Sequence, residues 1–298
     1  MSGRESISLL HLIPILVIPL LSPTFANVLI SSKILEEVET PFVREETLSG
    51  SIYNLLVFSA MFIPVVIIVY FLVRRRSIIL LKLFFSMSLA IAFATIAELY
   101  LEAFFLSLNL LNEKVLYLVY VFSIVAAIQA LLISLTEVPE LYEAFVCLIF
   151  GIAIGTFFGL ILPLWSIIVL CIAISVYDLY AVFYGPLKSL IDLEKKLLKS
   201  EGKPQGKTSA YLLKGMTIPV FGFRIGMGDI IFYSMIISGA YVYPSISLVR
   251  CFLSSIGIII GSYITLKLLV KRRKAMPALP IPSLLAIAIL LIALILGI

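Results

Sequence analysis

Hydrophobic residues occur in long runs along almost the whole chain, and short polar segments separate these runs. A helix that crosses the hydrocarbon core of a bilayer needs about 20 mostly apolar residues. The pattern predicts an all-α polytopic membrane protein with nine transmembrane helices, at residues 7–30, 51–73, 77–105, 115–136, 144–162, 164–184, 217–241, 246–270 and 277–298. A polar, basic loop at 185–216 separates the sixth helix from the seventh. We therefore expect a single membrane domain over 1–298, without a separate soluble domain.

The first run also admits a second interpretation. The polar start MSGRES, the apolar stretch and the small-residue segment SPTFA have the layout of a signal peptide. The apolar character continues through 27–30, which favours a spanning helix.

Composition supports a membrane environment. Hydrophobic residues make up 62% of the chain, charged residues 13%, and the mean hydropathy is +1.19. Soluble domains carry about 25% charged residues. The integral, multi-pass character therefore follows from composition as well as from pattern.

Lysine and arginine gather in the even-numbered loops, which predicts the orientation. The basic residues of these loops are Arg74, Arg75, Arg76, Lys188, Lys195, Lys196, Lys199, Lys203, Lys207, Lys214, Lys271, Arg272, Arg273 and Lys274. The even loops and the N-terminus are expected in the cytoplasm and the C-terminus outside. The net charge of +5 is then largely this orientation signal, with attraction to anionic membrane lipids and no need for a nucleic-acid partner.

Histidine and cysteine usage argues against several kinds of site. The three cysteines, Cys147, Cys171 and Cys251, are odd in number, far apart and all in apolar runs. Neither a disulfide framework nor a metal site is expected from such a pattern. His11 is the only histidine, so any Ser-His-Asp mechanism would depend on one residue in the first span.

Two of the three aspartates lie inside apolar runs, Asp178 in the sixth and Asp229 in the seventh, whereas Asp192 lies in the polar loop. A carboxylate at the centre of a membrane helix costs roughly 2.5–3.5 kcal/mol on insertion scales, and such residues usually face a bundle interior or a water-filled cavity. Counting about 1.5 Å per residue from Lys188 and from Pro219, each aspartate lies about 15 Å from the cytoplasmic end of its helix. We expect the two carboxylates to face each other near a polar cavity that opens to the cytoplasm.

Three short motifs surround these carboxylates or follow them. Tyr177 precedes Asp178, and Gly226, Met227 and Gly228 precede Asp229. The two glycines permit close approach of a neighbouring helix or of a substrate chain.

The third motif is Pro277-Ala278-Leu279, before the last run. Prolines disfavour helix at the residue before them, so 277–279 is expected to be extended and to lie beside 226–229. An ordinary proline-capped helix start remains the alternative for this segment.

Together the three motifs resemble those of the presenilin and signal peptide peptidase family of intramembrane aspartyl proteases. Their order, their spacing and the nine expected spans fit that family, and the chain looks most similar to a compact microbial, archaeal-type presenilin homologue in the plasma membrane. The resemblance implies catalytic roles for Asp178 and Asp229. It implies substrate binding by the other members of the motifs, Tyr177, Gly226, Met227, Gly228, Pro277, Ala278 and Leu279. Met227 departs from the leucine usual in the Gly-x-Gly-Asp motif.

The chemistry also follows from the carboxylates themselves. Two carboxyl groups a few ångströms apart share a proton, so that one acts as general base on a water and the other as general acid. No metal or organic cofactor is needed for peptide hydrolysis by this route. Expected substrates are proteins with a transmembrane helix, which must unwind before attack. The segment 277–279 is the candidate surface for pairing with the unwound backbone.

Other functions remain open from the sequence. The alternative from another class is a transporter or cation leak channel, because intramembrane carboxylates also carry ions and protons. Glu98 and Glu102, one turn apart in the third run, are candidate lining residues. A prepilin-peptidase-type protease would explain Asp229 but not 277–279. A non-catalytic scaffold is the remaining alternative.

Overall fold

The computed structural model describes residues 9–75, 77–183, 214–220, 223–272 and 277–298. Its helices are η1 (Leu9–Leu12), α1 (Ile13–Ser32), α2 (Ile34–Glu37), α3 (Leu48–Arg74), α4 (Ile78–Ser107), α5 (Glu113–Leu135), α6 (Glu140–Ile161), α7 (Leu164–Phe183), α9 (Met227–Val242), α10 (Leu248–Arg272) and α11 (Pro280–Ile295). Two short strands, β1 (Thr217–Val220) and β2 (Phe223–Gly226), form an antiparallel pair. Most of the basic loop expected at 185–216 lies outside the described residues.

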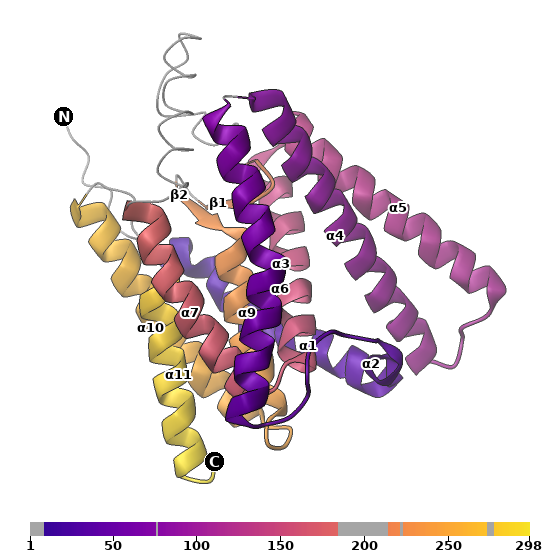
Figure 1. Ribbon diagram of the computed structural model, residues 1–298. Helices are drawn as coiled ribbons and strands as arrows, with labels where there is room; N and C mark the ends of the chain where they lie inside the picture. Colours follow the sequence, from indigo (N-terminus) through magenta and orange to yellow (C-terminus); the bar gives the residue numbers. More distant parts are fainter. Residues whose placement is uncertain (1–8, 76, 184–213, 221–222, 273–276) are drawn as a thin grey trace.

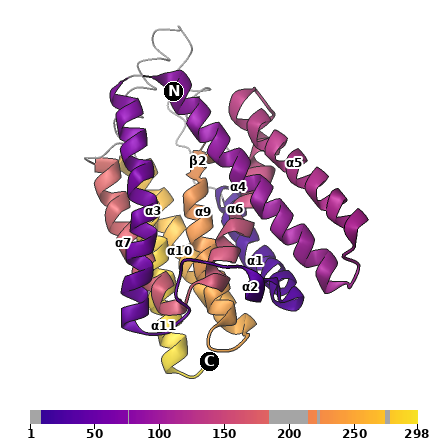
Figure 2. The same ribbon diagram turned by 45° about the vertical axis from the view of Figure 1, so that its right-hand side comes forward.

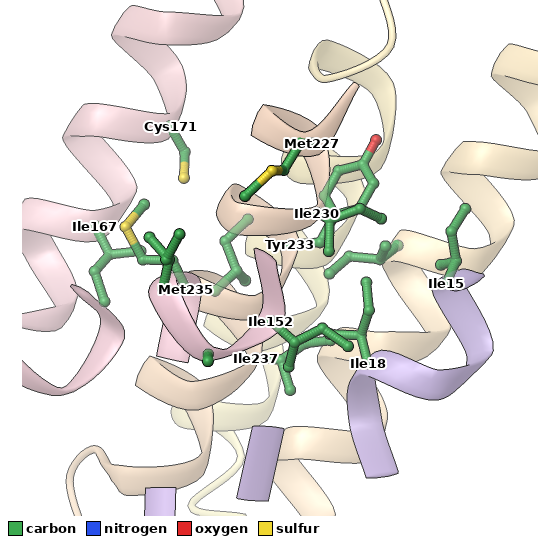
Figure 3. Close-up of a cluster of buried hydrophobic side chains, with 14 of the residues drawn as sticks. Ile15, Ile18, Ile152, Ile167, Cys171, Met227, Ile230, Tyr233, Met235 and Ile237 are labelled. Atoms are coloured by element: carbon green, nitrogen blue, oxygen red, sulfur yellow. The ribbon is translucent and has the colours of Figure 1, made fainter. Parts of the chain in front are cut away.

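The helices form one bundle with α9 in its middle (Figures 1 and 2). On one side α4 and α5 pack against each other, and on another α3 lies along α7. Along α9 most side chains are buried, and those of Tyr233, Met235 and Ile237 lie among residues of α1, α6 and α7 (Figure 3). A helix that is apolar on all faces is expected in such an interior position.

Helix lengths divide the apolar segments into two groups. Within the described residues, six helices are long and apolar enough to cross a membrane by length and composition. Three further apolar stretches are shorter, namely Leu164–Tyr180, Met227–Val242 and Pro280–Ile295. Helix length therefore supports six spans, and the arrangement with nine spans stays a prediction. The three short stretches are those that carry or follow the motifs singled out in the sequence.

The prediction of a helix over 217–241 is wrong for its first part. Strands β1 and β2 form a hairpin there, in which Thr217 pairs with Gly226 and Ile218 with Ile225. Alternate residues of β1, Ile218 and Val220, are buried, which is the periodicity of a half-buried strand. Gly226, the residue before α9, is a poor helix former, which favours the start of the helix at Met227. The hydrophobic run thus contains a hairpin followed by a helix of 16 residues.

Two pairs of helices approach each other closely through glycines. A Cβ atom at Gly155 of α6 would lie 2.7 Å from Cβ of Ser234 in α9 and nearer still to a backbone oxygen. A Cβ at Gly257 of α10 would lie 2.6 Å from Cα of Ala286 in α11. Small residues allow such approach between membrane helices. Helix α9 is thereby fixed to α6, and α11 to α10.

Candidate active site

Asp229 lies in the first turn of α9. The helix begins at Met227, after Gly226, whose backbone is extended with φ −63° and ψ 134°. The amide of Gly226 interacts with the Asp229 carboxylate. This is the arrangement of a capping box, in which the side chain of the third helical residue accepts from the amide of the residue before the helix. Asp229 therefore follows strand β2 almost directly. The expectation that it lies ten residues inside a helix starting at Pro219 is wrong, because the chain there is a strand.

Glycine at 226 and 228 leaves room around this carboxylate. A Cβ atom at Gly226 would lie 3.0 Å from Oδ2 of Asp229, which is tighter than most real contacts. A Cβ at Gly228 would meet nothing within 4 Å among the described residues, and Gly228 is exposed. The place that a side chain at residue 228 would take is therefore open, next to Asp229 in the first turn of α9.

Met227 lies elsewhere. Its side chain is buried in the core of the bundle, 5% exposed, near Gly151 of α6 (Figure 3). The prediction that Met227 contacts substrate is not supported by this position, because the first turn of α9 directs residue 227 toward α6. Its apolar character is explained by packing.

Asp178, near the end of α7, is half-buried and is bound by the segment that precedes α11. Its Oδ2 accepts a hydrogen bond from the amide of Leu279 at 3.3 Å, and the amide of Ala278 also interacts with this carboxylate. Tyr177 packs its ring edge-on against Phe62 of α3, with 5.3 Å between ring centroids. The ring of Tyr177 thus links α7 to α3.

The segment 277–279 is outside regular structure, and α11 begins at Pro280 rather than at residue 277. Its Pro277 and Leu279 side chains are buried and Ala278 is half-buried. Leu279 itself has helical dihedral angles, φ −76° and ψ −41°, so the expectation of an extended segment is wrong at this residue.

The reason is the hydrogen bonding of the Leu279 carbonyl. This oxygen accepts from the amide of Ser283 at 3.1 Å and from its hydroxyl at 2.6 Å. These bonds fix the first turn of α11 and outweigh the tendency of a residue before proline to be extended. The Ser283 hydroxyl also lies 3.1 Å from that of Ser175 in α7, one turn before Asp178.

Tyr233 completes the connection between the three helices. It lies four residues after Asp229, on the same face of α9, and its hydroxyl donates to the Ala278 carbonyl at 2.9 Å. The residue is 2% exposed and interacts electrostatically with Asp229 and Asp178. Sequence reasoning missed Tyr233, although its spacing from Asp229 was a usable signal.

The structure therefore brings together the carboxylates of α7 and α9 and the backbone that precedes α11. Asp178 and Asp229 are close enough to interact electrostatically. Within the described part of the chain, no three His, Cys, Asp or Glu side chains come together in a way that could hold a metal ion.

Sequence comparisons with known proteins all match presenilins or presenilin-like proteins. The sequence model of the presenilin family matches residues 199–296. Presenilin-B of Dictyostelium discoideum is 32% identical over 178 residues, which are 57% of this chain and 33% of that protein. A presenilin-like protein of Arabidopsis thaliana is 36% identical over 90 residues, which are 30% of this chain and 22% of that protein. The matches thus span a third or less of the curated relatives' own length.

Solved structures extend the likeness to almost the whole chain. A presenilin family intramembrane aspartate protease, in two crystal forms, has TM-scores of 0.60 and identities of 18% and 17%. The first alignment covers 95% of this chain and 99% of that one. The resemblance expected from the motifs is confirmed: the chain is presenilin-like in sequence over 199–296 by the family model and over 57% of its length by the Dictyostelium relative, and in fold over nearly its full length.

Proposed function

We propose that this protein is an intramembrane aspartyl endopeptidase of the Gly-x-Gly-Asp type, with Asp178 and Asp229 as its catalytic pair. The observation that carries the proposal is the approach of two carboxylates from apolar helices far apart in the chain, with the Leu279 amide bound to one of them. Further support comes from the fold, which matches a protein described as an intramembrane aspartate protease.

The reaction needs only these groups and water. One carboxylate takes a proton from the water molecule while the oxygen of that water attacks the scissile carbonyl carbon. The other carboxyl group donates a proton to the carbonyl oxygen, and the amine leaves after the nitrogen is protonated. The nitrogen takes the proton that the first carboxylate removed from the water, and the second carboxylate recovers its proton from a hydroxyl group of the tetrahedral intermediate as the C–N bond breaks. The products are a carboxylic acid and an amine, which ionise to a carboxylate and an ammonium group, and the pair returns to its starting state with one shared proton.

The substrate in this proposal is a protein with a transmembrane helix. Its carbonyl groups are hidden in helical hydrogen bonds, so the helix must unwind, and unpaired backbone in lipid is expensive. Strand β2 pairs with β1 along one edge and ends three residues before Asp229. Its other edge can accept an extended substrate strand by β-addition.

This assignment replaces 277–279 as the pairing surface. The Leu279 amide is already bonded to Asp178, and the Ala278 carbonyl accepts from Tyr233. The segment then orients a catalytic group, and the open space beside Gly228 receives the substrate.

The arrangement in the membrane is part of the same proposal. Nine spans, with the N-terminus in the cytoplasm and the C-terminus outside, place the hairpin end of the bundle toward the cytoplasm. The hairpin and the end of α11 lie at opposite ends of the bundle (Figure 1), which suits this orientation. The protein would reside in a microbial plasma membrane in contact with its lipids.

The test is cleavage of a single-span substrate by the detergent-solubilised protein. We expect cleavage that is blocked by an aspartyl transition-state mimic and lost in Asp178→Asn and in Asp229→Asn. Glu98→Gln in α4 is the matched acid-to-amide control, and it should cleave as the wild type does. Unchanged cleavage in either aspartate variant refutes the catalytic pair. A channel would instead be supported if the reconstituted protein showed ion flux but no proteolysis and if Glu98→Gln abolished that flux.

A further inference from the structure

An ion pair between a buried glutamate and a partly exposed arginine joins α6 to the hairpin. Glu143, in the first turn of α6, has a side chain only 1% exposed, and its Oε1 lies 3.1 Å from Nη1 of Arg224 in β2. The same guanidinium nitrogen donates to the Thr217 hydroxyl in β1 at 2.9 Å. A single arginine group therefore contacts α6 and bridges both strands.

The start of the hairpin is fixed to the same end of α6. Oε1 of Glu143 also accepts from the amide of Gly215 at 3.4 Å, and the Cys147 thiol, one turn further, donates to the Gly215 carbonyl at 3.4 Å. Gly215 has φ +79°, a conformation that favours glycine. At the other end of the hairpin, the Met227 amide donates to the Met216 carbonyl at 2.8 Å. The hairpin is thus held between α6 and the first residue of α9.

Stability alone is a poor explanation for this pair. Desolvation of two charges often offsets their attraction, and well-packed apolar residues can replace a buried pair without loss. Oε2 of Glu143 is buried and has no hydrogen-bond partner among the described residues, which adds to the desolvation. The pair is better explained by a role in fixing the position of the hairpin than by a contribution to stability.

We propose that Glu143 and Arg224 are positioning residues that fix the hairpin relative to Asp229 and so determine which peptide bond of the substrate is cut. The inference rests on the proposed function. A strand rises about 3.3 Å per residue, so a substrate strand that pairs with β2 in a register shifted by two residues presents a bond about 7 Å away to the carboxylates. Small movements of β2 would therefore change the cleavage position without altering the carboxylates.

The experiment compares Glu143→Gln, Arg224→Gln and the double variant with the wild type. Glu140→Gln is the control, because Glu140 is an exposed acid in the same turn of α6. The double variant leaves no unpaired buried charge, so it remains informative where a single variant fails to fold. Cleavage products are identified by mass spectrometry, kcat and KM are measured, and hydrogen exchange is followed in peptides that cover 214–226.

We expect cleavage at additional positions displaced along the substrate, KM higher by on the order of tenfold and kcat within about twofold of wild type. Amides of the hairpin should exchange on the order of tenfold faster. Glu140→Gln should match the wild type in all three measurements.

Wild-type cleavage positions and KM in the double variant, or unchanged exchange in 214–226, overturn this proposal. Failure of the proposed function has a different signature, namely wild-type protein without aspartate-dependent cleavage. Hydrogen exchange still decides in that case whether the pair holds the hairpin.

Discussion

The Leu279 amide offers the sharpest test of how the carboxylates are held. Leu279→Ala and Leu279→Pro both remove a side chain that is 1% exposed, which costs about 2–5 kcal/mol of folding stability in either variant. Only the proline also removes the donor to Asp178. The native φ of −76° lies within the range of proline, so the ring itself does not force the backbone at this residue to move.

The difference between the two variants isolates one hydrogen bond. A bond to a charged group contributes about 1.5–3 kcal/mol, and the 3.3 Å length places this one at the lower end. Since about 1.4 kcal/mol changes a rate tenfold, Leu279→Pro should have a kcat at least about tenfold below that of Leu279→Ala. KM should be similar in both, because the amide contacts Asp178 and not the substrate.

The assay is turnover of a single-span substrate at a temperature where thermal melts show both variants folded. Leu290→Ala, which empties another buried leucine site of α11, controls for loss of packing in that helix. Equal kcat for the alanine and proline variants at position 279 would refute the role of the amide. A higher KM with unchanged kcat in Leu279→Pro would instead assign the amide to substrate binding.

Three further outcomes are expected. The double variant of Asp178→Asn and Asp229→Asn should be no less active than either single variant, because the carboxylates act as one unit, and thermal melts should show equal or higher stability. Gly155→Ala should lower the free energy of unfolding by about 1–3 kcal/mol in denaturation experiments, because the new methyl group would lie 2.7 Å from Cβ of Ser234. An unchanged free energy of unfolding would contradict the close packing of α6 on α9. In Gly228→Ala the new methyl group would have no neighbour within 4 Å among the described residues, so the melting temperature should not fall. Cleavage should slow, because the methyl group enters the proposed substrate space. Wild-type kinetics would exclude that space.

The site could be predicted in part from the sequence because its chemistry is unusual for its surroundings. Aspartates inside apolar runs are visible without a structure, and so are the glycines and prolines near them. Tyr233 and Glu143 were missed because a tyrosine or a helix-initial acid is common. A signal for Glu143 did exist: it begins a series at spacing four, with Cys147, Gly151, Gly155 and Gly159, on the face of α6 that packs against α9 and the hairpin.

The errors arose where local rules competed with long-range contacts. A hydrophobic run does not distinguish a short buried strand from a helix, so the hairpin before α9 was read as part of a span. Proline statistics predicted an extended residue 279, but two hydrogen bonds from Ser283 to its carbonyl decided otherwise.

The sequence by itself determined the class of the molecule and the positions of most helices. Apolar runs predicted α3 and α4 at 51–73 and 77–105, within a few residues of Leu48–Arg74 and Ile78–Ser107, because a bilayer selects helices by length and hydrophobicity. Only the tertiary structure decided that the Leu279 amide binds Asp178, that Tyr233 links α9 to the same segment and that the buried Glu143 pairs with Arg224 to anchor the hairpin. These contacts depend on where close-packed helices place residues that are far apart in the chain. A local spacing shows which residues share a helix face, but not which distant residues that face meets.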